Sequence, residues 1–146
     1  MKFSISRDSL VRSLNLVAGV VERRQTLPIL ANVLLVLKED WLSLTGTDLE
    51  VELVGRIQLA VVGEESGEVT VPARKLLDIC KSLPEGSDIK FSAKENKVAV
   101  RSGSSRFTLS TLPAREFPNV ENSIGTHQLT LKQSQLKRLI DRTGFA

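Results

Sequence analysis

The sequence contains few of the side chains on which enzyme chemistry usually depends. Its 146 residues include one cysteine, one histidine and no tyrosine, and none of the HExxH, GxSxG, CxxC or GxxxxGKS/T spacings occurs. The single thiol, Cys80, has no second thiol with which to form a disulfide or hold a metal, so we interpret it as a core residue. His127 lies in the polar stretch NSIGTHQ and is interpreted as a solvated linker residue. We therefore predict no catalytic residue, no metal site and no cofactor.

Long hydrophobic runs are also missing. The longest, Val33 to Leu37, is far shorter than the roughly 20 residues that cross a bilayer. The N-terminal MKFSISRDSL lacks the apolar segment of a signal peptide. With 41% hydrophobic and 25% charged residues, the composition is that of an ordinary globular protein. We predict a cytosolic protein with no membrane partner.

A strand-then-helix unit occurs three times. Residues 3–14, FSISRDSLVRSL, align without gaps on residues 69–80, VTVPARKLLDIC, and on residues 129–140, LTLKQSQLKRLI. In each copy apolar residues alternate at first, as in a strand, and then recur at helical spacing. Three copies at near-regular spacing indicate a duplicated architecture.

Three strand-like segments follow each of the first two units, separated by charged, glycine-containing or proline-containing turns. These segments are 27–39, 41–47 and 48–62 in the first half and 87–93, 97–103 and 105–112 in the second. Each half is therefore βαβββ, and the expected fold class is α+β. We predict one domain over residues 1–119, a linker over 120–127, and the start of a second domain over 128–146.

The charge is unevenly distributed between the expected elements. The helical segments 7–24, 73–82 and 132–142 hold eleven basic and four acidic residues, whereas the remainder holds nine basic and 13 acidic residues. Basic helices on an acidic, strand-rich body suggest that the helices face a polyanion while the sheets face elsewhere. The alternative is that Lys and Arg are simply good surface helix formers.

The aromatic fraction limits how such a protein could bind nucleic acid. Only 4% of the residues are aromatic, so a stacking platform for single strands is not expected. No helix-turn-helix or zinc pattern is present to read base edges. The remaining possibility is salt-sensitive, sequence-independent contact with phosphates.

The sequence resembles the N-terminal third of the bacterial DNA polymerase III beta subunit, the sliding clamp. The resemblance is carried by RRQTLPILANVLL, LSLTGTDLEVEL, TVPARKLLDICKSLPEG and VRSGSSRFTLSTLPAREFPN, and covers nearly the whole chain. It implies the DNA clamp fold, with two βαβββ halves per domain and the helices on one face of antiparallel sheets. It also implies a processivity factor without chemistry of its own, whose head-to-tail homodimeric ring encircles duplex DNA and tethers the polymerase.

The resemblance also implies which residues touch DNA. The arginine before TLPIL and the arginine of VPARK correspond to Arg24 and Arg74, and these are the principal candidates. Arg12, Lys81 and Arg138 carry the right charge on the expected helices but have less specific motif support.

The family's subunit interface involves the second helix and the last strand of this domain. The corresponding residues are Lys75, Ile79, Leu83, Arg106, Phe107 and Leu109. Ile79, Leu83 and Phe107 could instead be core residues.

The resemblance further implies that the chain stops within the first helix of a second domain, so that the parts that bind the polymerase and the clamp loader are absent. Two other functions stay open: a protein-interaction scaffold that uses the edge SRFTLSTL, and, less favoured, an enzyme that uses Ser, Asp or Glu.

Overall fold

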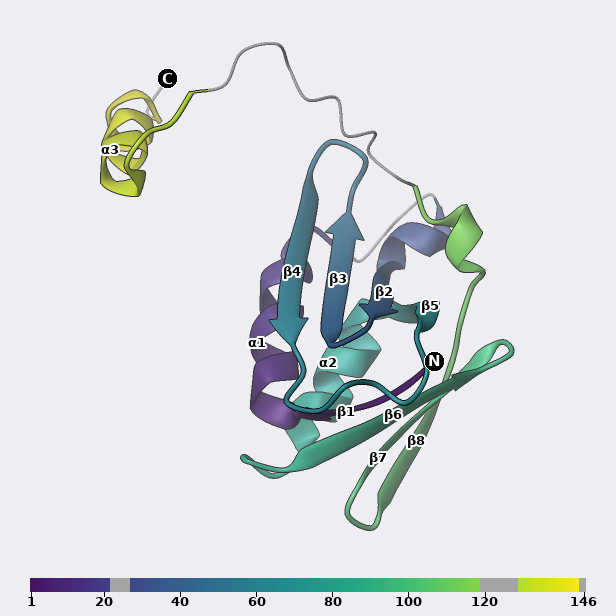
Figure 1. The fold of residues 1–146 in the computed structure, drawn as a ribbon. Coiled ribbons are helices and arrows are strands. Elements are labelled where there is room, and N and C mark those ends of the chain that lie inside the picture. Colours follow the sequence, from purple (N-terminus) through teal and green to yellow (C-terminus); the bar gives the residue numbers. More distant parts are fainter. Residues whose placement is uncertain (22–26, 119–128, 145–146) are drawn as a thin grey trace.

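The fold consists of two βαβββ halves followed by a separate helix (Figure 1). The structure, a computed structural model, describes residues 1–21, 27–118 and 129–144. The first half comprises β1 (Lys2–Ser6), α1 (Arg7–Val17), the 3-10 helix η1 (Pro28–Ala31), β2 (Asn32–Lys38), β3 (Trp41–Thr47) and β4 (Glu52–Gln58). The remaining elements are β5 (Gly67–Pro72), α2 (Ala73–Ser82), β6 (Asp88–Lys94), β7 (Lys97–Ser102), β8 (Ser105–Ser110), the 3-10 helix η2 (Ala114–Glu116) and α3 (Gln133–Thr143).

The predicted order of elements is confirmed, with two differences. Strand β3 and helix α2 have the predicted bounds, but α1 ends at Val17 instead of continuing to residue 24. Residues 129–132 form no strand, although the repeat predicts one there. A strand needs a neighbour for its backbone N–H and C=O groups, and the described residues supply none to this segment. Helix α3 forms without such a partner because its hydrogen bonds are internal.

The two halves exchange their first strands. Strand β1 of the first half pairs with β6, giving sheet A in the order β1-β6-β7-β8, and β5 of the second half pairs with β2, giving sheet B in the order β4-β3-β2-β5. Every pairing is antiparallel. Neither sheet can therefore be completed by one half alone.

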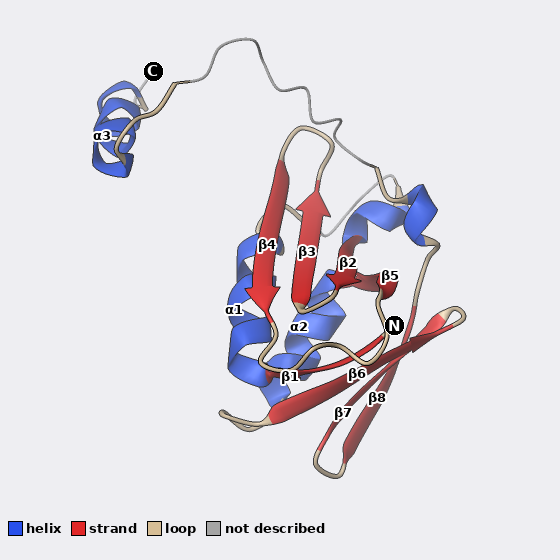
Figure 2. Ribbon diagram, viewed as in Figure 1, coloured by secondary structure: helices blue, strands red, loops and turns tan. Residues whose placement is uncertain are grey.

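Both sheets pack their inner faces and the two helices into one core (Figure 2). Alternate strand residues point inward, as the period of two requires, and the Phe3 and Phe91 rings stack across β1 and β6 with centroids 4.8 Å apart. Helix α1 contributes Leu10, Leu14 and Val17 to this core. The prediction that Cys80 is a core residue is confirmed, because it is fully buried in α2.

Glycine allows β3 to approach the end of α1. A Cβ atom on Gly46 would lie 2.7 Å from the carbonyl oxygen of Val17, a distance that any other side chain would have to relieve by moving the backbone. The glycine of the LTGTD motif therefore permits the close approach of β3 to the end of α1.

A buried hydroxyl on β5 joins sheet B to the segment that follows β8. Thr70 of β5 accepts a hydrogen bond from Asn32 Nδ2 at 3.0 Å and one from the Leu112 N–H at 3.2 Å, and its hydroxyl donates to the Leu112 carbonyl at 2.7 Å. Both Asn32 and Thr70 are buried. The chain that leaves β8 is thus attached to sheet B.

No helix within residues 1–21, 27–118 and 129–144 combines the length and the apolar character needed to cross a bilayer.

We expect Thr70→Val to lower the free energy of unfolding by about 1–3 kcal/mol, because it preserves the side-chain shape but leaves the buried Asn32 amide and the partly buried main chain of Leu112 without their partner. Urea unfolding measures this change. Thr45→Val is the matched control, because Thr45 is half-buried on β3 and makes no side-chain hydrogen bond to the described residues; it should change stability by less than about 0.5 kcal/mol. Equal effects of the two substitutions would contradict a structural role for the hydroxyl.

Candidate nucleic-acid interface

The helices α1 and α2 lie side by side (Figure 1). Their exposed surface is predominantly basic. Their buried residues face the sheets, so the positions left to solvent are mostly polar or charged. The exposed charged residues of the two helices are Arg12, Arg74, Lys75, Asp78 and Lys81. Four cations and one anion therefore occupy a surface with no aromatic side chain, which suits contact with phosphates but not base stacking.

Arg74 is held in position at one end of the helix pair. Its Nη2 donates a hydrogen bond to the carbonyl oxygen of Val21 at 3.0 Å, beyond the end of α1. A guanidinium has five N–H donors, so this bond leaves others available to an anion. The side chain is exposed, and the bond to Val21 limits its conformational freedom.

Arg7 holds the opposite end of the pair. Its Nε donates to the Cys80 carbonyl at 3.0 Å, and its Nη2 donates to the Lys81 carbonyl at 3.4 Å, at the C-terminus of α2. Orphan carbonyls and the negative helix dipole make this end a favourable place for a cation. Because the start of α1 meets the end of α2, the helices run antiparallel. Nothing in the sequence singles out Arg7, since the aligned positions in the other two repeats are Ala73 and Gln133.

Asp8 completes this junction. Its carboxylate accepts hydrogen bonds from Arg7 Nη1 at 2.8 Å and from the Gly86 N–H at 3.1 Å. These bonds, that from Arg7 above all, lower the pKa of Asp8 below its usual value. Arg7 therefore carries a charge that is partly neutralised, and the exposed cations of the helix pair remain the available ones.

The structure brings together only some of the predicted DNA-contact residues. Arg74 and Lys81 lie near opposite ends of α2, and Arg12 lies on α1 beside it. Arg138 lies on α3, apart from that pair in Figure 1. Arg24 lies outside the described residues.

The predicted interface residues lie on α2, at its C-cap and on β8, the edge strand of sheet A. Lys75 and Arg106 are exposed, and Ile79 and Phe107 are half-buried against the core. Leu83 and Leu109 are only 5% and 7% exposed. These two leucines therefore pack mainly within the domain, which is the alternative that the sequence leaves open for Leu83.

The acidic excess outside the helices does not lie on the faces of sheet A. Most of the acidic residues outside the helices lie in turns and loops: Glu39, Asp40, Asp48, Glu50, Glu64, Glu65, Glu85 and Glu95. Turns are where acidic side chains can accept backbone hydrogen bonds, as Asp48 does from the N–H groups of Glu50 and Val51. The charged residues on the solvent-facing side of sheet A are consequently mostly basic.

No catalytic arrangement is evident in the described part of the chain. Residues 1–21, 27–118 and 129–144 contain no group of three His, Cys, Asp or Glu side chains that could hold a metal. Burial raises the pKa of the Cys80 thiol to about 12, so it is not an activated nucleophile. What this surface can do chemically is bind anions.

Comparison with known proteins gives consistent matches over the whole chain. The family model of the DNA polymerase III beta subunit, N-terminal domain, matches residues 1–121. The beta sliding clamp of Pseudomonas putida is 62% identical over 146 residues, which are 100% of this chain and 40% of the relative. That of Vibrio harveyi is 49% identical over 147 residues, covering 100% of both chains.

Solved structures agree with these matches. The crystal structure of the DNA polymerase III subunit beta from Pseudomonas aeruginosa superposes with a TM-score of 0.95 at 59% identity, over 100% of this chain and 39% of that one. The chain thus spans about 40% of the length of the first curated relatives that it matches.

The junction at Asp8 generates a prediction about acid stability. The pKa of Asp8 is lower in the folded chain than in the unfolded chain. The ionised carboxylate therefore stabilises the folded chain above the unfolded pKa of about 4, and this stabilisation is lost as the pH falls through the folded-state pKa. We expect Asp8→Asn to reduce the drop in melting temperature between about pH 6 and about pH 3. The control is Asp88→Asn, since Asp88 is exposed and its carboxylate accepts no hydrogen bond from the described residues. The same acid sensitivity in wild type and Asp8→Asn would refute the role of this carboxylate.

Proposed function

The chain belongs to the family of DNA polymerase III beta subunits, the sliding clamps, and we propose that it forms the first domain of a ring that encircles duplex DNA. The observation that carries the proposal is the basic, aromatic-free surface of α1 and α2, on the side of the helices away from the sheets. In a ring, this surface would line the hole and the sheets would form the wall.

Contact with DNA is proposed to be made through phosphates alone. Arg74 is the principal described candidate because it is exposed and pre-positioned by Val21. Arg24 is proposed on the family resemblance only. Arg12 and Lys81 would extend the contact along the helix pair, and Arg138 would belong to the next domain. Phosphate contacts carry no sequence information, so such a ring would bind any duplex.

Weak phosphate contacts suit a protein that moves along DNA. A closed ring is retained by its topology, so its contacts with DNA need not be individually strong. Interchangeable phosphate contacts then allow the ring to slide. The ring would raise the effective concentration of the replicative polymerase at the primer end, which is a gain from tethering and not from chemistry. The proposed role is thus that of a non-catalytic accessory subunit that needs no cofactor.

Ring closure is proposed to use a head-to-tail homodimer. Strand β8 is the edge of sheet A, and such an edge offers unpaired backbone groups to a strand of another subunit. Lys75 and Ile79 of α2, with Arg106 and Phe107 of β8, would supply exposed or half-buried side chains to this interface. Leu83 and Leu109 are almost completely buried in the domain and would contribute to the interface mainly by packing beneath its exposed side chains.

A second clamp domain is proposed to begin at residue 128, after the domain of residues 1–119 and a linker of residues 120–127. Helix α3 is amphipathic, and its Leu136, Leu139 and Ile140 are 48–58% exposed. An apolar stripe at this spacing is typical of a helix that packs on a sheet. Contacts with the polymerase and the clamp loader are proposed to involve parts of a clamp other than residues 1–146. The proposed location is the bacterial cytoplasm, at replication forks.

The encircling mechanism predicts a difference between DNA topologies. We expect a chimaera in which this chain replaces the corresponding 146 residues of the Pseudomonas putida clamp, once loaded, to stay on circular duplex DNA at a salt concentration that releases it from linear duplex. Retention is measured by gel filtration of the loaded DNA, with the unaltered P. putida clamp as the control. Release from both DNAs at the same salt concentration would rule out encirclement.

The phosphate contacts predict a change in salt dependence. Arg24→Ala and Arg74→Ala should each reduce the slope of log K against log salt concentration by roughly one unit for duplex DNA. Fluorescence anisotropy of the 146-residue chain measures the slope, and Arg56→Ala, an exposed arginine on β4 of sheet B, is the control. Slopes equal to that of the control would remove both residues from the DNA contact. Absence of any salt-dependent binding by the wild type would favour the protein-interaction scaffold.

A further inference from the structure

The outer face of sheet A, which points away from the core, carries a second concentration of positive charge. Its charged side chains are those of Lys2, Lys90, Lys94, Lys97, Arg101 and Arg106, with Asp88 as the one anion on the strands and Glu64 beside Lys2. This face is the side of sheet A opposite to the inward-pointing side chains of the same strands, such as Phe91 and Val100, which face the core and the helices. It is therefore a surface distinct from that of the helix pair.

The cations on this face stand directly opposite one another. Lys90 is paired in register with Arg101, Arg101 with Arg106, and Lys94 with Lys97. Like charges at directly opposed positions of antiparallel strands destabilise a sheet. None of the ion pairs within the described residues involves this face. No ion pair within the described residues therefore relieves this repulsion, and a bound anion would relieve it.

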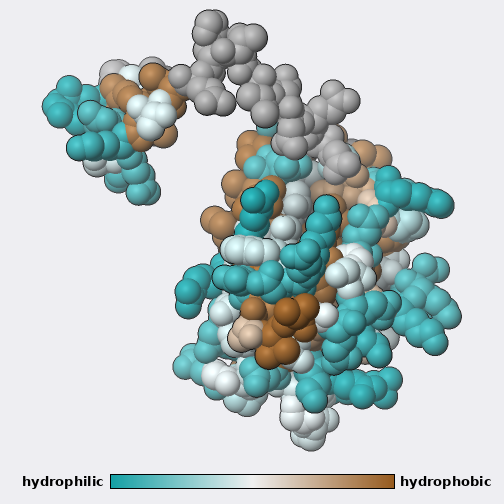
Figure 3. All heavy atoms as spheres, viewed as in Figure 1, coloured by the Kyte–Doolittle hydropathy of each residue, from teal (hydrophilic) through white to brown (hydrophobic). Residues whose placement is uncertain are grey.

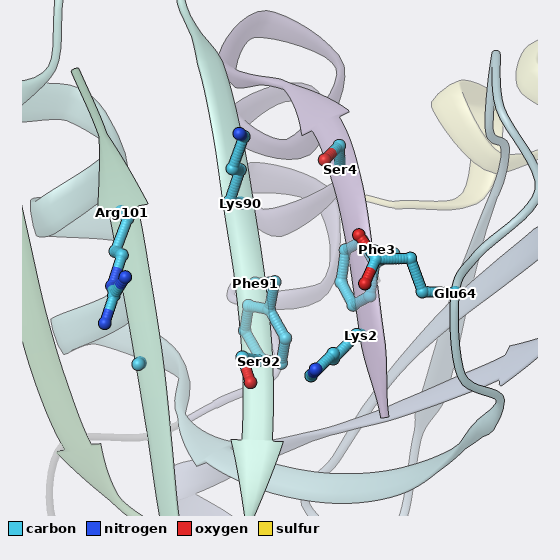
Figure 4. Close-up of a pocket in the computed structure, with 9 residues that line it drawn as sticks. Lys2, Phe3, Ser4, Glu64, Lys90, Phe91, Ser92 and Arg101 are labelled. Carbon is cyan, nitrogen blue, oxygen red and sulfur yellow. The ribbon is translucent and has the colours of Figure 1, made fainter.

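Small side chains make a hollow between these cations. Ser4, Ser92 and Ala99 lie among Lys2, Lys90 and Arg101 and line a depression of about 390 Å³ (Figure 4). Figure 4 shows Lys90 and Arg101 on neighbouring strands, with Ser4 and Ser92 beside them. Lysine, arginine and serine are side chains that commonly donate hydrogen bonds to the phosphates of nucleic acids.

The chemistry of the face favours a nucleic-acid backbone over a protein partner. Protein interfaces depend on buried aromatic or large apolar residues, and none of the exposed large hydrophobic residues of the described chain lies on a strand of sheet A, although Val61 of the loop after β4 borders the face beside Ser4 and Asp88. The lower part of the space-filling view, where sheet A lies, is mostly teal and white around one brown patch (Figure 3). Phe3 and Phe91, which are the nearest aromatic rings, are buried beneath it, so bases would find no stacking surface.

We propose that the outer face of sheet A is a second binding site for nucleic acid, in which Lys90 and Arg101, with Lys2, Ser4 and Ser92, contact the phosphodiester backbone. This site does not depend on the proposed function of the helix pair. It would hold a segment of DNA on the outside of the domain while the helices face another segment.

The test compares two double variants of the 146-residue chain with the same loss of charge. Lys90→Gln/Arg101→Gln alters the proposed site. Lys38→Gln/Arg56→Gln alters an exposed lysine and an exposed arginine on the outward side of sheet B. Binding to a fluorescent duplex and to the matching single strand is measured over a series of salt concentrations.

We expect Lys90→Gln/Arg101→Gln to weaken binding to duplex at low salt roughly tenfold and to reduce the salt slope by about two units, or by about 1.4 units for the single strand. Lys38→Gln/Arg56→Gln should change either slope by much less. Equal effects of the two double variants would overturn the proposal, because only net charge would then matter.

Two additional anionic probes distinguish a nucleic-acid site from a site for an acidic protein or a membrane. Selective loss of binding to polyglutamate, or to phosphatidylglycerol vesicles, with DNA binding intact would overturn the proposal in favour of an acidic protein or a membrane surface. Combination with Arg74→Ala should add its own slope change if the surfaces act independently. An effect of Lys90→Gln/Arg101→Gln without any effect of Arg74→Ala would support this site while contradicting the helix-face contact.

Discussion

The exchange of first strands between the two halves is the constraint on which the rest of the domain depends. Because β1 completes the sheet of the second half and β5 that of the first, the halves share one hydrophobic core. Each helix directly follows an exchanged strand, so α1 and α2 are brought to the same place and pack together. Arg7 and Arg74 then fix the two ends of this pair through main-chain carbonyls. The basic surface is a consequence of how the sheets are built.

Two positive surfaces on one small domain create a different electrostatic situation from that of a protein with a single basic patch. The acidic residues that would otherwise balance these positive charges are concentrated in turns. There their carboxylates can accept hydrogen bonds from backbone N–H groups, as that of Asp48 does. The strand faces are left with few anions. At physiological ionic strength screening acts over about 8 Å, so each surface would attract a polyanion largely independently of the other.

The sequence predicts the elements well and their neighbours less well. Periodicity states which face of a strand is buried, and for β3 and α2 it also gives the bounds. It does not state which strand lies beside which, so the exchange of β1 and β5 is not visible in it. The predicted end of the first helix is wrong because the run of apolar and charged residues after Val17 is also compatible with a helix. The close approach of Gly46 to the Val17 carbonyl, at the observed helix end, is a long-range contact that periodicity does not reveal. The basic face of sheet A is missed for a different reason: charge counted per element averages the turns with the strands. No sequence pattern predicts the role of Arg7 in joining the two helices, because that role depends on the carbonyl of Cys80, 73 residues away.

The complete burial of Cys80 has a consequence for the redox chemistry of the molecule. With a pKa of about 12, the thiol is almost fully protonated at neutral pH. Thiolate is the species that reacts with disulfides and alkylating agents, so reaction requires that the region around α2 open first. Since the sequence has no other thiol, the rate of thiol alkylation in the folded chain would report the opening of this region alone.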